Sequence, residues 1–217
     1  MIPAVSAEFV CQMEEVLDLY AEVVDPKRPR VCVDERPVQL ISEVRELIPA
    51  APGRPQRHDY EYKREGTANL FMLACPDRGW RQVKVTERRG TLDFAHVLKD
   101  LVDVHFPDAE RIRLVMDNLN THALSTLYEV FDAAEARRIA RKFEVHYTPK
   151  HGSWLNMAEI EFSVLADQCL DRRIPDQERL RRESAAWARR RNEAKATIDW
   201  RFTTEVARSK LERVYPS

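Results

Sequence analysis

The sequence has no apolar run that approaches the roughly 20 residues needed to cross a bilayer, and it contains no internal repeat or low-complexity tract. Its first residues, Met1-Ile-Pro-Ala-Val, lack the basic end and long apolar core of a signal peptide. Its four cysteines form no Cys-x-x-Cys pair, which argues against a zinc site or a disulfide framework. These absences favour a folded protein of a reducing cytoplasm.

The net charge of −1 conceals a strong segregation of charge along the 217 residues. Residues 1–50 carry a net charge of −5, residues 54–89 of +4, residues 90–170 of −5 and residues 171–217 of +5. Such alternation is expected if metal ions and a polyanion share one surface. Ordinary solvated helix faces are the alternative explanation.

Hydrophobic periodicity and turn residues predict a mixed α/β sheet followed by a basic helical tail. A hairpin is predicted at Pro76-Asp-Arg-Gly79. The expected strands cover residues 31–35, 60–62, 68–74, 81–86, 111–116 and 143–147. The expected helices cover residues 6–23, 42–47, 91–105, 123–131, 133–142, 156–170, 176–196 and 203–214.

Three segments place acidic residues beside the ends of these elements, and they are Asp34-Glu35, Asp117 and Glu159-x-Glu161. Two-metal phosphoryl-transfer sites need several carboxylates, because hard divalent cations prefer oxygen ligands. Each acid also has a structural explanation. Asp34 could end a strand, Asp117 could cap a helix or form an Asx-turn, and Glu159 could complete a capping box with Asn156.

The two glutamates of the helix predicted over 156–170 differ in their position around the helix axis. At about 100° per residue, Glu159 falls within the apolar stripe of this helix and Glu161 falls outside it. A glutamate that faces inward is costly unless something satisfies it, and a metal ion would do so. The geometry therefore favours Glu159 as the ligand and predicts that Glu161 is a surface acid.

Polar residues around these acids are candidates for DNA contact. His122 could be a core or surface histidine, contact a phosphate or position a nucleophile. Trp154 could stack on a base or fill the core, and the core position is favoured. The arginine-rich segment 172–191 could be a solvated helix face or could contact DNA or another subunit. The predicted DNA-binding residues are Asn118, Asn120, His122, Lys150, His151, Ser153, Asn156, Arg172 and Arg173.

Four segments occur together in an order that resembles one known family. It is the catalytic domain of bacterial DDE-type insertion-sequence transposases, in the branch related to mariner elements, and the resemblance covers residue 26 to the C-terminus. The segments are Val31-Cys-Val-Asp-Glu, Gly66-Thr-Ala-Asn-Leu-Phe, Met116-Asp-Asn-Leu-Asn-Thr-His and Tyr147-Thr-Pro-Lys-His-Gly-Ser-Trp-Leu-Asn-Met-Ala-Glu.

The resemblance implies a ribonuclease H-like fold, with a mixed five-stranded sheet whose first and fourth strands are adjacent. It places the family's Asp-Asp-Glu triad on Asp34, Asp117 and Glu159, which would hold two Mg²⁺ ions, or Mn²⁺ as a substitute. It implies DNA cleavage and strand transfer on double-stranded transposon ends and target, by a homodimer near the bacterial nucleoid. The separation of Asp117 from Glu159 exceeds that of typical mariner relatives, and residues 133–142 look like the added helix.

The expected organisation is an N-terminal helix and linker (1–25), a catalytic domain (26–175) and basic C-terminal helices packed on it (176–217). Family members usually carry an N-terminal helix-turn-helix region, so we expect a catalytic fragment or a truncated transposase. Two alternatives stay open at this point. One is a catalytically silent DNA-binding or assembly remnant, and the other is a ribonuclease or structure-specific nuclease on the same fold.

Overall fold

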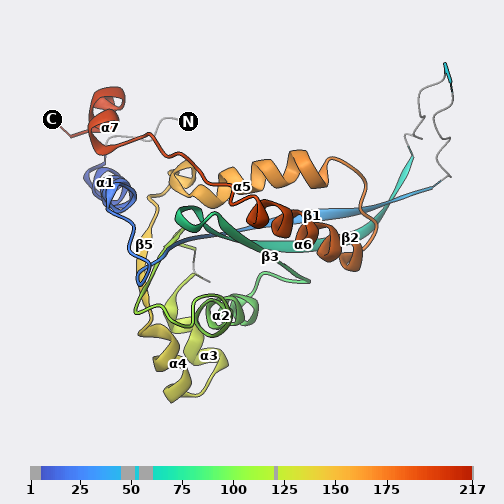
Figure 1. Cartoon of the computed structure of the whole chain (residues 1–217), viewed down its shortest axis with the longest axis horizontal. Coiled ribbons are helices and arrows are strands. Elements are labelled where there is room, and N and C mark those ends of the chain that lie inside the picture. The colour runs from blue at the N-terminus through green and yellow to red at the C-terminus, as the bar shows by residue number, and fades with distance from the viewer. Residues whose placement is uncertain (1–5, 45–51, 54–60, 120–121, 217) are drawn as a thin grey trace.

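Five strands form a mixed sheet in the order β3-β2-β1-β4-β5, with helices on both faces (Figure 1). The computed structural model describes residues 6–44, 52–53, 61–119 and 122–216. The strands are β1 (Arg30–Glu43), β2 (Tyr62–Cys75), β3 (Trp80–Thr86), β4 (Ile112–Met116) and β5 (Phe143–Tyr147). The helices are α1 (Ala7–Ala21), α2 (Thr91–Asp100), α3 (Leu127–Val130), α4 (Ala133–Ala140), α5 (Met157–Leu165), α6 (Gln177–Glu193) and α7 (Thr204–Lys210).

The strand pairing confirms the predicted mixed sheet and the adjacency of the first and fourth strands. β1 pairs antiparallel with β2, and β2 with β3, whereas β1 pairs parallel with β4, and β4 with β5. One core, which includes Met13, Phe162 and Trp187, lies between the sheet and α1, α5 and α6. A second core, which includes Phe94 and Ile139, lies between the opposite face and α2, α3 and α4.

The first two strands are much longer than predicted and extend as a two-stranded ribbon beyond the sheet (Figure 1). Their pairing runs from Cys32 opposite Ala74 to Glu43 opposite Tyr62. The helix predicted over 42–47 is therefore wrong at residues 42 and 43, and its residues 45–47 lie outside the described part of the chain. The strands predicted at 60–62 and 68–74 join into β2, because pairing across the ribbon overrides local propensity.

The helices follow the prediction closely, with breaks in regular geometry that the sequence pattern does not show. The helix predicted over 91–105 is α2 followed by a π-helical turn at Leu101–His105, and that over 156–170 is α5 followed by a π-helical turn at Ala166–Leu170. The helix predicted over 123–131 begins as a 3-10 turn, Leu124–Thr126, before α3. No helix in the described residues is long and apolar enough to span a membrane.

The hairpin predicted at Pro76–Gly79 is confirmed, and its glycine is required by packing. Gly79 has a φ of 58°, in the left-handed region that favours glycine. A side-chain Cβ at this position would lie 2.7 Å from the backbone carbon of Lys195, just after α6. The turn thus lies directly against the chain that leaves the basic helix.

Glu161 is buried in the core side of α5, which corrects the prediction that it is a surface acid. Its carboxylate accepts hydrogen bonds from Arg81 on β3, at 3.0 Å, and from Arg191 on α6, at 3.1 Å. The side chains of Arg81 and Glu161 are each only 1% exposed. Asn192 of α6 also exchanges hydrogen bonds with the backbone of Arg81. This ion network holds α6 against β3 and α5.

The prediction for Glu159 and Glu161 was wrong because the apolar stripe on which it rested includes residues that are not all in one α-helix. Leu155 lies in a 3-10 turn before α5, and Ala166–Leu170 form the π-helical turn after it. These residues displaced the inferred stripe towards Glu159. Within α5 itself the buried residues are Met157, Ala158, Glu161, Phe162 and Leu165.

Replacement of Glu161 by glutamine should destabilise the fold, because it leaves two arginines in or near the core without a counter-charge. Breaking a buried ion pair by removing one partner costs about 3–5 kcal/mol. We expect a loss of this size for Glu161→Gln in the free energy of unfolding, measured by denaturant titration. Asp167→Asn, at an exposed acid of the π-helical turn that follows this helix, is the matched control and should change stability by less than about 0.5 kcal/mol. Equal stability of the two variants would contradict the role of the network.

Candidate active site

Two of the three predicted ligands lie level with each other where β1 and β4 run side by side. The parallel register pairs Cys32 of β1 with Val115 of β4. Two residues further along each chain it reaches Asp34 and Asp117. Side chains two residues apart on a strand point to the same face. Both Cys32 and Val115 belong to the core under α5, so Asp34 and Asp117 are directed to the face that carries Glu159.

The electrostatics of Asp34 show that these carboxylates lie near one another. The pKa of Asp34 is raised to about 7, first by burial and then by repulsion from Glu159. The carboxylates of Glu35 and Asp117 raise this pKa further, while a 2.8 Å hydrogen bond from the Glu35 N–H partly opposes the rise. Four acids, two from β1, one just after β4 and one from α5, thus lie in one region of negative charge.

Glu159 lies in the first turn of α5 and is exposed, and its carboxylate makes no hydrogen bond or ion pair with any described residue. Its backbone N–H donates a 3.0 Å hydrogen bond to the Asn156 carbonyl. The capping box that could have explained it is not formed. Asn156 alone caps the helix, through a 3.1 Å hydrogen bond that its Oδ1 accepts from the Ala158 N–H. The Glu159 carboxylate is therefore left free beside Asp34.

Asn156 is only 1% exposed, so its side chain stabilises the fold and is not accessible for the predicted DNA contact. While its Oδ1 caps α5, its Nδ2 donates a 2.8 Å hydrogen bond to the carbonyl of Val33. Val33 directly precedes Asp34 on β1. Asn156 therefore ties the start of the helix that carries Glu159 to the strand that carries Asp34.

His122 is buried between two acids, which corresponds to the core alternative for this residue. It is 1% exposed, its Nδ1 is paired with Asp117 Oδ1, and its Nε2 lies 2.8 Å from Glu35 Oε2. Burial lowers the pKa of His122, but the contacts with Asp117 and Glu35 outweigh it and raise the pKa to about 9. Asp117 caps no helix, because the next helical turn begins after Ala123.

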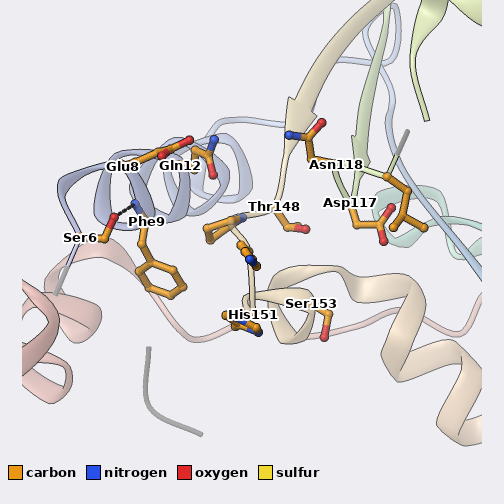
Figure 2. A pocket seen from close by; sticks show the side chains of 12 residues that line it. Ser6, Glu8, Phe9, Gln12, Asp117, Asn118, Thr148, His151 and Ser153 are labelled. Carbon is orange, nitrogen blue, oxygen red and sulfur yellow. Dashed lines mark hydrogen bonds between the residues drawn. The ribbon is translucent and has the colours of Figure 1, made fainter. Parts of the chain in front are cut away.

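A pocket of about 670 Å³ opens beside Asp117 (Figure 2). Asp117 and Asn118 line one wall, and Ser6, Phe9 and Gln12 of α1 line another. The α1 wall was not predicted, and its periodic sequence indicated only a packed helix. The loop after β5 closes the pocket with Thr148, Pro149, Lys150, His151 and Ser153.

The loop after β5 presents two polar side chains, those of Lys150 and His151, outside the core. Lys150 and His151 are exposed, and His151 has a positive φ of 66°. The Gly152 N–H donates a 2.8 Å hydrogen bond to the Pro149 carbonyl, which closes the turn. A Cβ at Gly152 would lie 2.6 Å from the Pro149 ring, so only glycine fits. The predicted phosphate-binding residues thus border the pocket.

Other predicted contact residues lie elsewhere. Arg172 and Arg173 follow the π-helical turn at the far end of α5, where they form ion pairs with Glu183 and Glu43. They do not line the pocket. Trp154, predicted to fill the core, is 42% exposed and touches Phe202 edge-on. Asn120 lies outside the described residues.

The donor set suits a hard divalent cation, since the three candidate ligands are carboxylates and one of them is unpaired. A cation would also relieve the repulsion that raises the pKa of Asp34. Among the described residues, no three Asp, Glu, His or Cys side chains are already close enough to hold a metal ion. The three candidate carboxylates therefore do not form a ready-made ligand set in the described structure.

Sequence comparison assigns the chain to a family. A family model for DDE superfamily endonucleases matches residues 29–181, which is most of the chain. The protein therefore belongs to the DDE superfamily endonucleases. No curated protein sequence matches the chain.

Solved structures of Mos1 transposase share the fold of this chain. A Mos1 mariner paired end complex with Mn matches with a TM-score of 0.59 and 14% identity, over 99% of this chain and 64% of that one. The Mos1 Strand Transfer Complex matches with a TM-score of 0.60 and 15% identity, over 94% and 59%. A mariner Mos1 paired end complex with Mg matches with a TM-score of 0.51 and 12% identity, over 92% and 66%. The chain spans about three fifths of the length of these Mos1 chains and shares their fold.

The raised pKa of Asp34 predicts how stability responds to pH without divalent metal. The folded state holds the Asp34 proton more tightly than the unfolded state does, so stability falls as pH rises from about 4 to about 7. Asp34→Asn removes this penalty. We expect the variant to exceed the native chain in free energy of unfolding by up to about 4 kcal/mol at pH 8, with a smaller gap at pH 5.

Chemical denaturation in EDTA at pH 5, 6.5 and 8 measures this gap. A control at an exposed acid of the same face, Asp167→Asn, should show no such pH dependence. A gap that is absent at pH 8, or that shrinks as pH rises, would contradict the clustering of the four acids.

Proposed function

We propose that this chain is the catalytic portion of a DNA transposase, which cleaves DNA strands and joins them to a target. The observation that carries this proposal is the position of Asp34, whose pKa is raised by Glu159 and Asp117 from separate elements, beside an open pocket. Membership in the DDE superfamily endonucleases and the shared Mos1 fold support it. Residues 29–181 of the family match fall largely within the domain proposed over 26–175.

Asp34, Asp117 and Glu159 would hold divalent metal ions, Mg²⁺ or Mn²⁺, of which two are proposed. When bound, such ions supply Lewis-acid activation of an attacking oxygen and stabilise the leaving oxygen. The contribution of the chain itself is to position the three carboxylates. β1 and β4 fix the two aspartates level with each other, and the cap formed by Asn156 fixes the helix of Glu159 against β1.

Double-stranded DNA would enter along the pocket, with its backbone next to the loop after β5. Lys150, His151 and Ser153 would contact phosphates there, and Asn118 would contact the DNA from the opposite wall. Among these groups Lys150 supplies a positive charge at the wall of the pocket. We propose a homodimer on DNA, since the two ends of one element have to be handled together.

Nicking of supercoiled plasmid DNA tests this function without knowledge of an element's end sequence. The full chain should nick DNA in Mg²⁺ or Mn²⁺ and not in EDTA. Each of Asp34→Asn, Asp117→Asn and Glu159→Gln should lower the rate by about 10³-fold or more, because a ligand supplies several kcal/mol of transition-state stabilisation. The initial rate, followed by gel electrophoresis, is the quantity compared.

Asp167→Asn is the matched control for removing one exposed acid, and it should keep the native rate. Undiminished nicking by Asp117→Asn would contradict the proposed mechanism. A native chain that binds DNA and never nicks it in Mn²⁺ would favour the alternative of a catalytically silent remnant.

A further inference from the structure

Behind Asp117 lies a buried pair of side chains, Glu35 and His122, that the proposed reaction does not use directly. The side chain of Glu35 is 4% exposed and that of His122 is 1% exposed. One ring nitrogen of His122 is paired with Asp117 Oδ1, and the other lies 2.8 Å from Glu35 Oε2. The three side chains form a continuous line from the sheet interior to the pocket.

His122 is held in one orientation by contacts on several sides. Its ring lies on that of Phe94 from α2, with centroids 4.7 Å apart and planes tilted by 33°. Its backbone N–H donates a 2.8 Å hydrogen bond to the Leu119 carbonyl, and its own carbonyl accepts a 3.0 Å bond from the Tyr147 hydroxyl. The ring therefore has no freedom to swing away from Asp117.

Glu35 reaches His122 because adjacent residues of a strand point to opposite faces. Asp34 faces α5 and the pocket, whereas Glu35 follows Val31 and Val33 to the face covered by α2. Arg89, between β3 and α2, lies 3.9 Å from the other oxygen of Glu35. Burial of a second acid beside the cluster is costly unless it is paired, and His122 supplies that partner.

The contact with His122 makes the two carboxylate oxygens of Asp117 different from each other. Because a carboxylate oxygen can only accept, the Nδ1 of His122 carries a hydrogen and donates it to Asp117 Oδ1, while Nε2 is in ion-pair contact with Glu35. Oδ1 of Asp117 is thereby occupied, and Oδ2 is left for a ligand on the pocket side. Partners of this kind orient the ligands of metal sites and commonly change metal affinity by about 10–100-fold when removed.

We propose that Glu35 and His122 are positioning residues, which hold the Asp117 carboxylate in the orientation that binds a divalent cation. This inference rests on the proposed function, because it assumes that Asp117 is a ligand. It assigns roles to two residues in the interior of the fold, away from both the DNA and the reacting atoms.

Two isosteric replacements separate the two contacts of His122. Asparagine places an amide N–H near the position of Nδ1 and can still donate to Asp117, whereas glutamine places its amide near Nε2 and reaches only Glu35. We expect His122→Asn to bind Mn²⁺ within about threefold of the native affinity. We expect His122→Gln to lose about 10–100-fold. Mn²⁺ affinity is measured by electron paramagnetic resonance on the folded full chain, well below its melting temperature.

Three further variants complete the experiment. His96→Gln, at an exposed histidine of α2, should keep native Mn²⁺ affinity. Glu35→Gln should weaken binding by less than His122→Gln does, because it leaves the hydrogen bond between His122 and Asp117 in place. Asp117→Asn is the reference for loss of the ligand itself.

The outcomes distinguish this inference from the function on which it rests. Loss of Mn²⁺ affinity in Asp117→Asn and His122→Gln, with recovery in His122→Asn, supports the inference. If Asp117→Asn loses affinity and His122→Gln keeps it, the positioning role is wrong while the ligand assignment stands. Equal loss in the asparagine and glutamine variants also overturns it. Native affinity in Asp117→Asn overturns both.

Discussion

The parallel pairing of β1 with β4 is the constraint on which the rest of the site depends. It joins chain segments about 80 residues apart and sets Asp34 level with Asp117 at a single sheet edge. The helix that carries Glu159 and the Asp117 side chain are both connected to β1 by further contacts. Asn156 anchors the start of α5 to the Val33 carbonyl, and His122 joins Asp117 to Glu35. A shift of one residue in this register would send Asp34 to the opposite face of the sheet.

The structure separates two kinds of buried or clustered acid. Glu161 is fully satisfied by Arg81 and Arg191, so it serves the packing of α6 on the sheet. In the cluster around Asp34, His122 pairs with Asp117 and Glu35, whereas the Glu159 carboxylate has no hydrogen-bond or ion-pair partner in the described chain. Repulsion between neighbouring carboxylates destabilises the fold. Because these carboxylates lie beside an open pocket, a cation bound there would relieve the repulsion.

The ordered motifs carry the family resemblance, which predicted that the first and fourth strands are adjacent, and the pairing of β1 with β4 confirms it. The choice of Asp34, Asp117 and Glu159 as ligands stays a prediction. Helical periodicity placed Glu159 inside and Glu161 outside, and the structure has the reverse. Their burial depends on where regular helix gives way to a π-helical turn at Ala166, and on arginines from distant elements. The burial of His122 and the contribution of α1 to the pocket also depend on tertiary packing, which periodicity does not report.

The central claim is that Asp34, Asp117 and Glu159 together hold divalent cations. A crystal structure of the chain soaked with Mn²⁺, with anomalous scattering recorded at the manganese edge, tests it most directly. The account predicts anomalous peaks within ligand distance of all three carboxylates, with Asp117 bound through Oδ2. Peaks elsewhere, or ions held by Glu35 or Glu161 in place of Glu159, would contradict it.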